Sequence, residues 1–302
     1  MTAPREADGS LELVLAARAQ LGECPLWSEP DQRLYWVDID GGAVHGFDPA
    51  AGTDTAVPVP GRPGSIALTR MPGRLLVAVE CQLGMLDFGT GAWQDWREVE
   101  PEGTQNRFND GRCDAAGRFW VGSMNESEDG RRTGSLYRVE ADGTSAPMRA
   151  DVGVPNALAF SPDGRTMYWS DTHRDVVWAY DYDIDDGVPT RERVFLDFSD
   201  LPGRLDGACV DEDGGYWIAC VFGSVVLRAT PGGAVDRVIS VPVAKPTMPA
   251  FGGPDRSTLY VTTIGGGGSH PLDPDPTAGG LFAIETDRRG IAEWPFAGPI
   301  GA

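Results

Sequence analysis

The feature of this chain that most limits its fold is a hairpin pattern that recurs six times along its 302 residues. Residues 155–171, PNALAFSPDGRTMYWSD, show the pattern clearly, because two short apolar runs flank a Ser-Pro-Asp-Gly turn. The copies align on one position in the second run: Tyr35, Leu76, Trp120, Tyr168, Trp217 and Tyr260. These positions lie 41 to 49 residues apart, which is typical of a propeller blade. The pattern predicts an all-β fold, a six-bladed β-propeller with four-stranded blades.

The two ends of the chain set the expected limits of the domain. The run LELVLAARAQ at residues 11–20 is a candidate fourth strand for the last blade. Pairing it there would close the ring and leave no strand edge free. We therefore expect residues 11–302 to form a single propeller domain and the polar residues 1–10, MTAPREADGS, to be a disordered tail.

Composition excludes several classes of partner. The formal net charge is −20 at pH 7, and because phosphate binding requires clustered Lys and Arg, we expect no nucleic-acid partner and no anionic membrane surface. No apolar run approaches the ~20 residues of a membrane span, and the first residues lack the apolar core of a signal peptide. The five cysteines include no CxxC pair, which predicts free thiols and a cytoplasmic protein. A monomer and a small homo-oligomer both remain possible.

The repeat also predicts which residues meet at the centre of the ring. In a propeller the first strand of each blade lines the central channel, so equivalent positions near its start converge on the axis. Counting back 11 or 12 residues from the aligned positions gives Glu23, Ser65, Asn109, Asn156, Asp206 and Pro249. Two carboxylates and two amides are thereby brought together. These are hard oxygen donors of the kind that bind a divalent cation.

Four segments contain the polar channel residues: LGECPLW, RFNDGRCDAAGRFWVGSM, GVPNALAFSPDG and LDGACVDEDGGYW. In sequence and in order they resemble the senescence marker protein/gluconolactonase family of six-bladed propellers, which includes regucalcin and bacterial sugar lactonases. The resemblance implies one divalent metal ion held by Glu23, Asn156 and Asp206, with Asp206 also acting as general base. It implies that Asn109 helps to bind metal water or substrate, and that Arg107 binds substrate.

The chain departs from the family at two places. The family often has Pro-Asp-Gly where this chain has Leu205-Asp206-Gly207, although the aspartate is kept. The family also often has an acidic residue that contacts substrate hydroxyls at the position of Ser127, and here Glu126, one position earlier, is the candidate for that contact. This second difference concerns sugar preference rather than the reaction itself.

Together these features predict metal-dependent hydrolysis of a sugar (aldono-)lactone, a small-molecule substrate, to the open hydroxy acid. The metal would polarise the ring carbonyl, and Asp206, metal-bound water or both would supply the nucleophile. Ca²⁺ is the expected cofactor because the ligand set contains neither His nor Cys, with Zn²⁺, Mg²⁺, Mn²⁺ and Fe²⁺ as alternatives.

Two other functions fit parts of the pattern. The first keeps the metal but hydrolyses an organophosphate ester or an aromatic lactone, and it would need an apolar wall built from Trp27, Phe108 and Phe222. The second is a non-catalytic calcium-binding propeller, which would have no need for Arg107.

Overall fold

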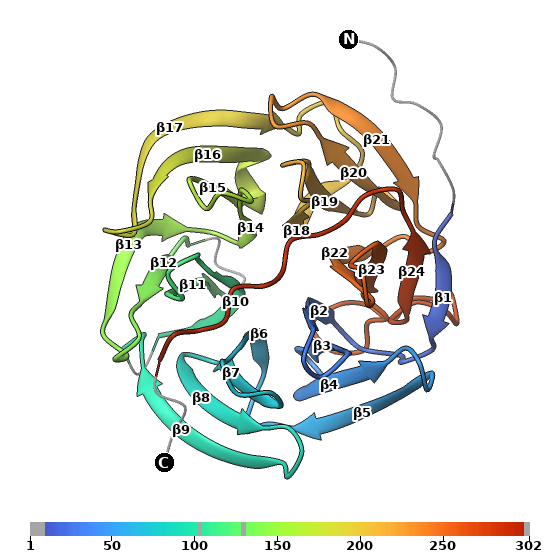
Figure 1. Ribbon diagram of the computed structural model, residues 1–302, viewed down its shortest axis with the longest axis horizontal. Coiled ribbons are helices and arrows are strands. Elements are labelled where there is room, and N and C mark those ends of the chain that lie inside the picture. Colours follow the sequence, from blue (N-terminus) through green and yellow to red (C-terminus); the bar gives the residue numbers. More distant parts are fainter. Residues whose placement is uncertain (1–9, 102–103, 128–130, 299–302) are drawn as a thin grey trace.

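The structure is a computed structural model that describes residues 10–101, 104–127 and 131–298. Within these residues, 24 strands form six antiparallel four-stranded sheets arranged as blades around a central axis (Figure 1). The predicted six-bladed β-propeller is therefore confirmed. The predicted tail falls mostly on residues outside the described ranges, and Ser10 forms a β-bridge with Ser240.

Each blade runs from an innermost strand at the channel to an outermost strand at the rim. The first three blades are β2 (Gly22–Ser28), β3 (Arg33–Asp38), β4 (Ala43–Asp48) and β5 (Thr53–Pro58); β6 (Pro63–Leu68), β7 (Arg74–Val79), β8 (Gln82–Asp87) and β9 (Ala92–Glu98); and β10 (Asn106–Cys113), β11 (Phe119–Asn125), β12 (Gly134–Val139) and β13 (Ser145–Val152). The next two are β14 (Pro155–Phe160), β15 (Thr166–Asp171), β16 (Val176–Asp183) and β17 (Val188–Asp197); and β18 (Arg204–Val210), β19 (Tyr216–Val221), β20 (Val225–Ala229) and β21 (Val235–Ser240). A short 3₁₀-helix, η1 (Thr172–Arg174), follows β15.

The sixth blade closes the ring with strands from both ends of the chain. It consists of β22 (Pro246–Gly252), β23 (Thr258–Thr263), β24 (Leu281–Glu285) and the N-terminal β1 (Glu12–Leu15). Leu13 pairs with Phe282, so the predicted outer strand of the last blade is confirmed. The strand β1 thus covers the edge of β24 that would otherwise be free.

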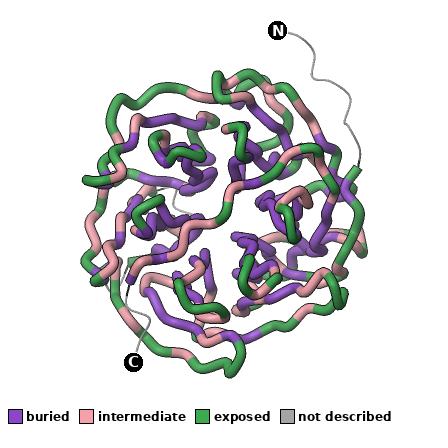
Figure 2. Tube along the Cα trace, in the orientation of Figure 1, coloured by how far each residue is buried: buried purple, intermediate pink, exposed green. Residues whose placement is uncertain are grey.

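Burial falls from the channel to the rim (Figure 2). The strand β14 is buried along its whole length, whereas β5 is mostly exposed. Between the blades, Trp36, Trp120, Trp169 and Trp217 are each at most 1% exposed. Apolar and aromatic residues therefore occupy the second strands because both faces of these strands pack against neighbouring blades, where burial of a large side chain contributes about 1.5–3 kcal/mol.

The two faces of the ring differ in what covers them. The innermost strands all begin at one face, which we name the top face, and the hairpin turns that connect first and second strands lie at the opposite, bottom face. Residues 286–298, which we name the C-terminal strap, leave β24 and cross the centre of the ring (Figure 1). Gly290 bridges to Asp211, and the amide of Phe296 donates to the Leu68 carbonyl at 2.8 Å. Both partners belong to the bottom face, so the strap covers that end of the channel.

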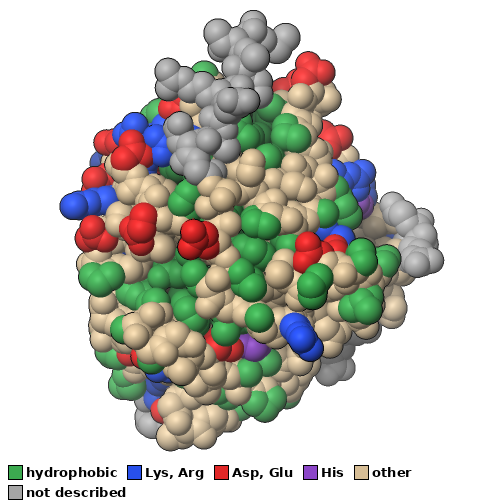
Figure 3. Space-filling view, turned by 90° about the vertical axis from the view of Figure 1, so that its right-hand side faces the viewer, with side chains coloured by type: hydrophobic (Ala, Val, Ile, Leu, Met, Phe, Trp, Pro, Cys, Tyr) green, Lys and Arg blue, Asp and Glu red, His purple; other side chains and the backbone are tan. Residues whose placement is uncertain are grey.

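Charged side chains are mixed on the side of the ring shown in Figure 3. Among the side chains coloured there, Lys and Arg are scattered between acidic residues and form no continuous basic patch. In the described ranges, no helix combines the length and the apolar character that crossing a membrane would require. All five cysteines are free thiols, as predicted.

Candidate active site

The four polar residues predicted for the channel lie on four of the six innermost strands. Glu23 is on β2, Asn109 on β10, Asn156 on β14 and Asp206 on β18, and each is 4 to 8% exposed. In all four strands the pairing with the second strand shifts register at this point, as in a β-bulge. Bulges turn a side chain out of the regular alternation and are common beside active sites.

The pairing corrects two members of the predicted set. In every blade, the residue three positions after the aligned aromatic or aliphatic residue pairs with a residue of the innermost strand. The channel residue is the one that comes directly after this partner. In blades two and six this rule selects Gly64 and Thr247 instead of Ser65 and Pro249. The count from the channel residue to the aligned residue ranges from 11 to 13 between blades, so a count of 11 misses Gly64 by one position and Thr247 by two. A Cβ atom at Gly64 would lie 2.3 Å from the Phe108 carbonyl oxygen, so blade two contributes no side chain.

Backbone strain accompanies two of the site residues. Cys24 and Ala157, which directly follow Glu23 and Asn156, have φ values of 46° and 62°. Left-handed backbone is unfavourable for residues other than glycine and tends to be kept at functional sites. Burial raises the pKa of the Cys24 thiol, and its Sγ accepts from the Ile66 amide at 3.3 Å, so this cysteine packs as a small apolar side chain.

A chain of hydrogen bonds holds the two amides in fixed orientations. The Asn109 Nδ2 donates to the Asn156 Oδ1 and to the Pro155 carbonyl, both at 3.0 Å. The Asn156 Nδ2 in turn donates to the Thr172 Oγ1 at 2.8 Å, and this hydroxyl donates to the Leu205 carbonyl at 3.2 Å. Blades three, four and five are thereby connected at the site, and the Asn156 oxygen keeps a second lone pair for another partner.

Arg107 and Glu126, both predicted to bind substrate, contact each other. The Arg107 Nε donates to Glu126 Oε1 at 2.8 Å, while its Nη1 donates to the Asn109 Oδ1 and the Phe108 carbonyl, both at 2.9 Å. Glu126 also accepts from the Arg62 Nη1 at 2.7 Å, and Arg62 pairs with Glu80. Sequence reasoning missed Arg62, because it precedes β6 in a loop without a motif and meets Glu126 only in the folded ring.

Three buried carboxylates repel one another in the channel. Burial, followed by the charge of Asp110, raises the pKa of Glu23 to about 8. Burial, followed by the charges of Glu23 and Asp110, raises the pKa of Asp206 well above its ordinary value. Burial likewise raises the pKa of Asp110 to about 6. Each carboxyl is costly to ionise here because water is excluded and no counter-charge sits against it.

These carboxylates fit a divalent cation. In the described part of the chain, none of the three forms an ion pair with Lys, Arg or His within 4.0 Å, and the Asp110 Oδ1 is buried without a hydrogen-bond partner. No group of three or more His, Cys, Asp or Glu side chains in those ranges is arranged to hold a metal by itself. Two carboxylates would therefore need an amide oxygen, such as that of Asn156, to complete a set of hard donors.

Comparison with known proteins gives the family. Residues 21–265 match the SMP-30/Gluconolactonase/LRE-like region. The chain belongs to this family. The resemblance inferred from the four segments is thereby confirmed.

Relatives of this SMP-30/gluconolactonase family match almost the whole chain. A 6-deoxy-6-sulfogluconolactonase of Pseudomonas putida is 40% identical over 292 residues, which cover 96% of this chain and 99% of the relative. An L-arabinolactonase of Azospirillum brasilense is 38% identical over 294 residues, which cover 96% of each chain. The crystal structure of regucalcin from Agrobacterium tumefaciens, described as a calcium-binding protein, aligns with a TM-score of 0.88 at 29% identity and covers 95% of this chain and 97% of that one.

In this family member the apolar wall required by an organophosphatase or aromatic lactonase is not assembled. Phe222 is 61% exposed, but Phe108 is fully buried in the core of blades two and three. Trp27 is 3% exposed and stacks on Tyr260 near the bottom face. Only Phe222 is thus available to a ligand at the top face, because Phe108 fills space between blades and Trp27 lies at the bottom face.

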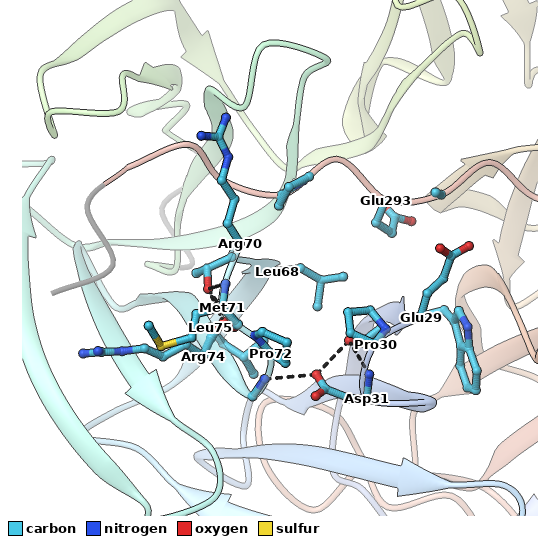
Figure 4. Close-up of a pocket in the computed structure, with 16 residues that line it drawn as sticks. Glu29, Pro30, Asp31, Leu68, Arg70, Met71, Pro72, Arg74, Leu75 and Glu293 are labelled. Carbon is cyan, nitrogen blue, oxygen red and sulfur yellow. Dashed lines mark hydrogen bonds between the residues drawn. The ribbon is translucent and has the colours of Figure 1, made fainter.

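A separate pocket lies at the opposite end of this propeller (Figure 4). It has a volume of about 200 Å³ and is lined by the hairpin turns of blades one and two together with Ala292, Glu293 and Pro295 of the C-terminal strap. Glu23, Asn109, Asn156 and Asp206 are not part of its lining. The pocket is therefore distinct from the candidate metal site at the top of the channel.

Proposed function

We propose that this protein is a metal-dependent lactonase that hydrolyses a sugar (aldono-)lactone to the open hydroxy acid. The observation that supports this most directly is the convergence of Glu23 and Asp206, two buried carboxylates without a basic partner, beside the amides of Asn109 and Asn156. Relatives that cover 96% of the chain carry lactonase names. Fold similarity alone would not support an activity, but here the site residues and the relatives favour the same reaction.

One divalent cation would be held by Glu23, Asn156 and Asp206. All three supply oxygen, which favours Ca²⁺ over metals that prefer nitrogen or sulfur ligands. When bound, the cation polarises the lactone carbonyl and stabilises the negative charge that develops on its oxygen. It would also remove the repulsion that raises the pKa values of both carboxyls.

The side chains around this centre have distinct tasks in the proposed reaction. Asp206 accepts a proton from the attacking water while the water oxygen forms a bond to the carbonyl carbon. When the ring C–O bond breaks, the same proton can pass to the ring oxygen, which leaves as a hydroxyl of the product. Arg107 presents the N–H donors of its Nη2 to the substrate, and the Asn109 Oδ1, which accepts one bond from Arg107, keeps a lone pair for metal-bound water or a substrate hydroxyl. Glu126 fixes the guanidinium of Arg107 in place.

The experiment that tests this function measures metal and turnover on the same samples. Chelator-treated protein is loaded with Ca²⁺, Zn²⁺ or Mn²⁺ and assayed by pH-stat against a panel of aldonolactones, with metal-only and protein-free blanks to correct for spontaneous opening. We expect about one bound cation per chain and turnover well above the blanks. A variant carrying Glu23→Gln and Asp206→Asn should lose both. Turnover no faster than the metal-only blank for every lactone would support a non-catalytic calcium-binding propeller instead.

A further inference from the structure

The lower part of the channel contains a buried ion pair that none of the roles above uses. Arg112 is on β10, three residues after Asn109, and is 6% exposed. Its Nη1 donates to both carboxylate oxygens of Glu293, at 2.8 and 3.1 Å, and its Nη2 donates to the Ala208 carbonyl of β18 at 3.2 Å. Arg112 therefore spans the channel between blades three and five beneath Asn109 and Asp206, and its counter-ion comes from the C-terminal strap.

The strap holds Glu293 in place from both sides. On one side the Gly290 amide donates to the Arg256 carbonyl at 2.9 Å, and on the other the Ala297 amide donates to the Gly117 carbonyl at 2.9 Å. Phe296 is fully buried and packs edge-on against Trp96 with ring centroids 5.4 Å apart. Figure 4 shows Glu293 on the strap at the edge of the bottom pocket, which Glu29 also lines.

Arg112 lies within electrostatic range of the carboxylates above it. Burial raises the pKa of Asp110 to about 6, and the charge of Arg112 acts against this rise. Arg112 is two residues after Asp110 along β10, and the Ala208 carbonyl that it contacts is two residues after Asp206. A positive charge at the base of this cluster would oppose the binding of a cation unless another group compensates it. Glu293 is the group placed to do so.

We propose that Glu293 of the C-terminal strap sets the affinity of the metal centre by neutralising Arg112. This inference rests on the proposed function, because it assumes that Glu23, Asn156 and Asp206 hold the cation. With Glu293 paired to Arg112, the carboxylates above keep their net negative charge. Without it, the unpaired guanidinium would repel the incoming cation across a channel of low dielectric.

The two partners of this ion pair should have opposite effects on metal binding, which a merely structural role would not produce. Glu293→Gln removes a negative charge and should weaken Ca²⁺ binding to chelator-treated protein by about tenfold, since charges interact strongly at a partly buried site. Arg112→Met removes a positive charge and should tighten Ca²⁺ binding. Arg112→Lys keeps the charge and should restore an affinity close to that of the wild type.

Calorimetric titration with Ca²⁺ measures these dissociation constants, and a thermal melt of each variant verifies folding. The matched control is Glu29→Gln, which removes one negative charge from the same bottom pocket but from a partner of Arg256 at the surface. It should leave the Ca²⁺ affinity unchanged. If Arg112→Met does not fold, Glu293→Gln against Glu29→Gln still decides the matter.

Three results would overturn the inference, and they are distinguishable from one another. Wild-type protein that binds neither Ca²⁺ nor Mn²⁺ would refute the proposed metal centre and the inference with it. Wild-type protein that binds Ca²⁺, together with a folded Glu293→Gln variant of equal affinity, would refute only the role of the strap. Equal weakening by Glu293→Gln and Arg112→Met would also refute it, because that pattern indicates loss of structure rather than of charge.

Discussion

At the scale of single residues, the channel contains buried carboxylates that lower the stability of the fold. Glu23, Asp110 and Asp206 are at least nine-tenths buried and have no basic partner within 4.0 Å in the described ranges. Buried carboxylates of this kind are destabilising unless something compensates their charge. They are therefore better explained by a ligand than by the requirements of folding.

Replacing one of these carboxylates should separate stability from activity. We expect Asp206→Asn to raise the melting temperature of the metal-free protein near neutral pH, because it removes a buried carboxyl that folding forces either to bind a proton or to carry an unpaired charge. At saturating metal, lactone hydrolysis should nevertheless fall by ~10²–10⁴-fold, the usual contribution of a positioned base. Melting curves in chelator and turnover at saturating Ca²⁺ measure the two effects. Full activity in the metal-saturated variant would exclude Asp206 as the base.

At the scale of strands and loops, the bulges place the site residues and a short helix orients them. Thr172, the first residue of η1, accepts from the Asn156 amide and donates to the Leu205 carbonyl. The loop after β15 thus fixes which end of the Asn156 carboxamide faces Asn109. A carboxamide that could rotate would present its NH₂ group to a cation for part of the time.

Removal of that hydroxyl should therefore weaken the metal centre without touching a ligand. We expect Thr172→Val to keep the fold and to reduce Ca²⁺ affinity several-fold in calorimetric titration. Thr172→Ser keeps the hydroxyl and serves as the matched control, so its affinity should stay close to that of the wild type. Equal affinities for the valine and serine variants would show that the Asn156 orientation does not depend on Thr172.

The sequence was sufficient to find the polar residues of the channel but not to complete their set. Glu23, Asn109, Asn156 and Asp206 follow from the repeat because each is a polar residue that lies 11 or 12 positions before its aligned residue. Gly64 and Thr247 were missed because strand pairing, which depends on each bulge, fixes their positions. Arg62 could not be found, since its contact with Glu126 joins residues 64 positions apart in different blades.

At the scale of the whole molecule, the ring is closed twice. The pairing of β1 with β24 was predictable, because an apolar run at the N-terminus matched a missing fourth strand. The strap was not predictable, since residues 286–298 have neither a strand period nor a turn motif, and Phe296 and Glu293 find their partners only across the bottom of the assembled ring. The channel is thus covered at the bottom, while the candidate site lies where the innermost strands begin.

This arrangement predicts an unusual pH dependence for the metal-free protein. Burial, with neighbouring carboxylates, raises the pKa of Glu23 from 4.5 to about 8 and that of Asp206 in the same direction. Between pH 4.5 and about pH 8 the folded chain binds more protons than the unfolded chain, so the free energy of unfolding decreases as the pH rises. The stabilising contribution of Glu23 is complete below its unfolded pKa of 4.5 and is lost as the pH passes its folded pKa. His270 acts in the opposite direction, because burial lowers its pKa below 6.5.

Melting temperatures in chelator should therefore decrease from about pH 5 to about pH 8, since the carboxyls outnumber the single histidine in this window. Saturating Ca²⁺ should flatten or reverse the trend, because the cation replaces the protons, and at 100 times its dissociation constant it adds ~2.7 kcal/mol. The Glu23→Gln and Asp206→Asn double variant should keep only the smaller slope that the raised pKa of Asp110 produces, and it should show no response to Ca²⁺. A chelated wild-type protein whose stability rises steadily to pH 8 would mean that these carboxyls are already compensated, and the argument for a cation in the channel would then fail.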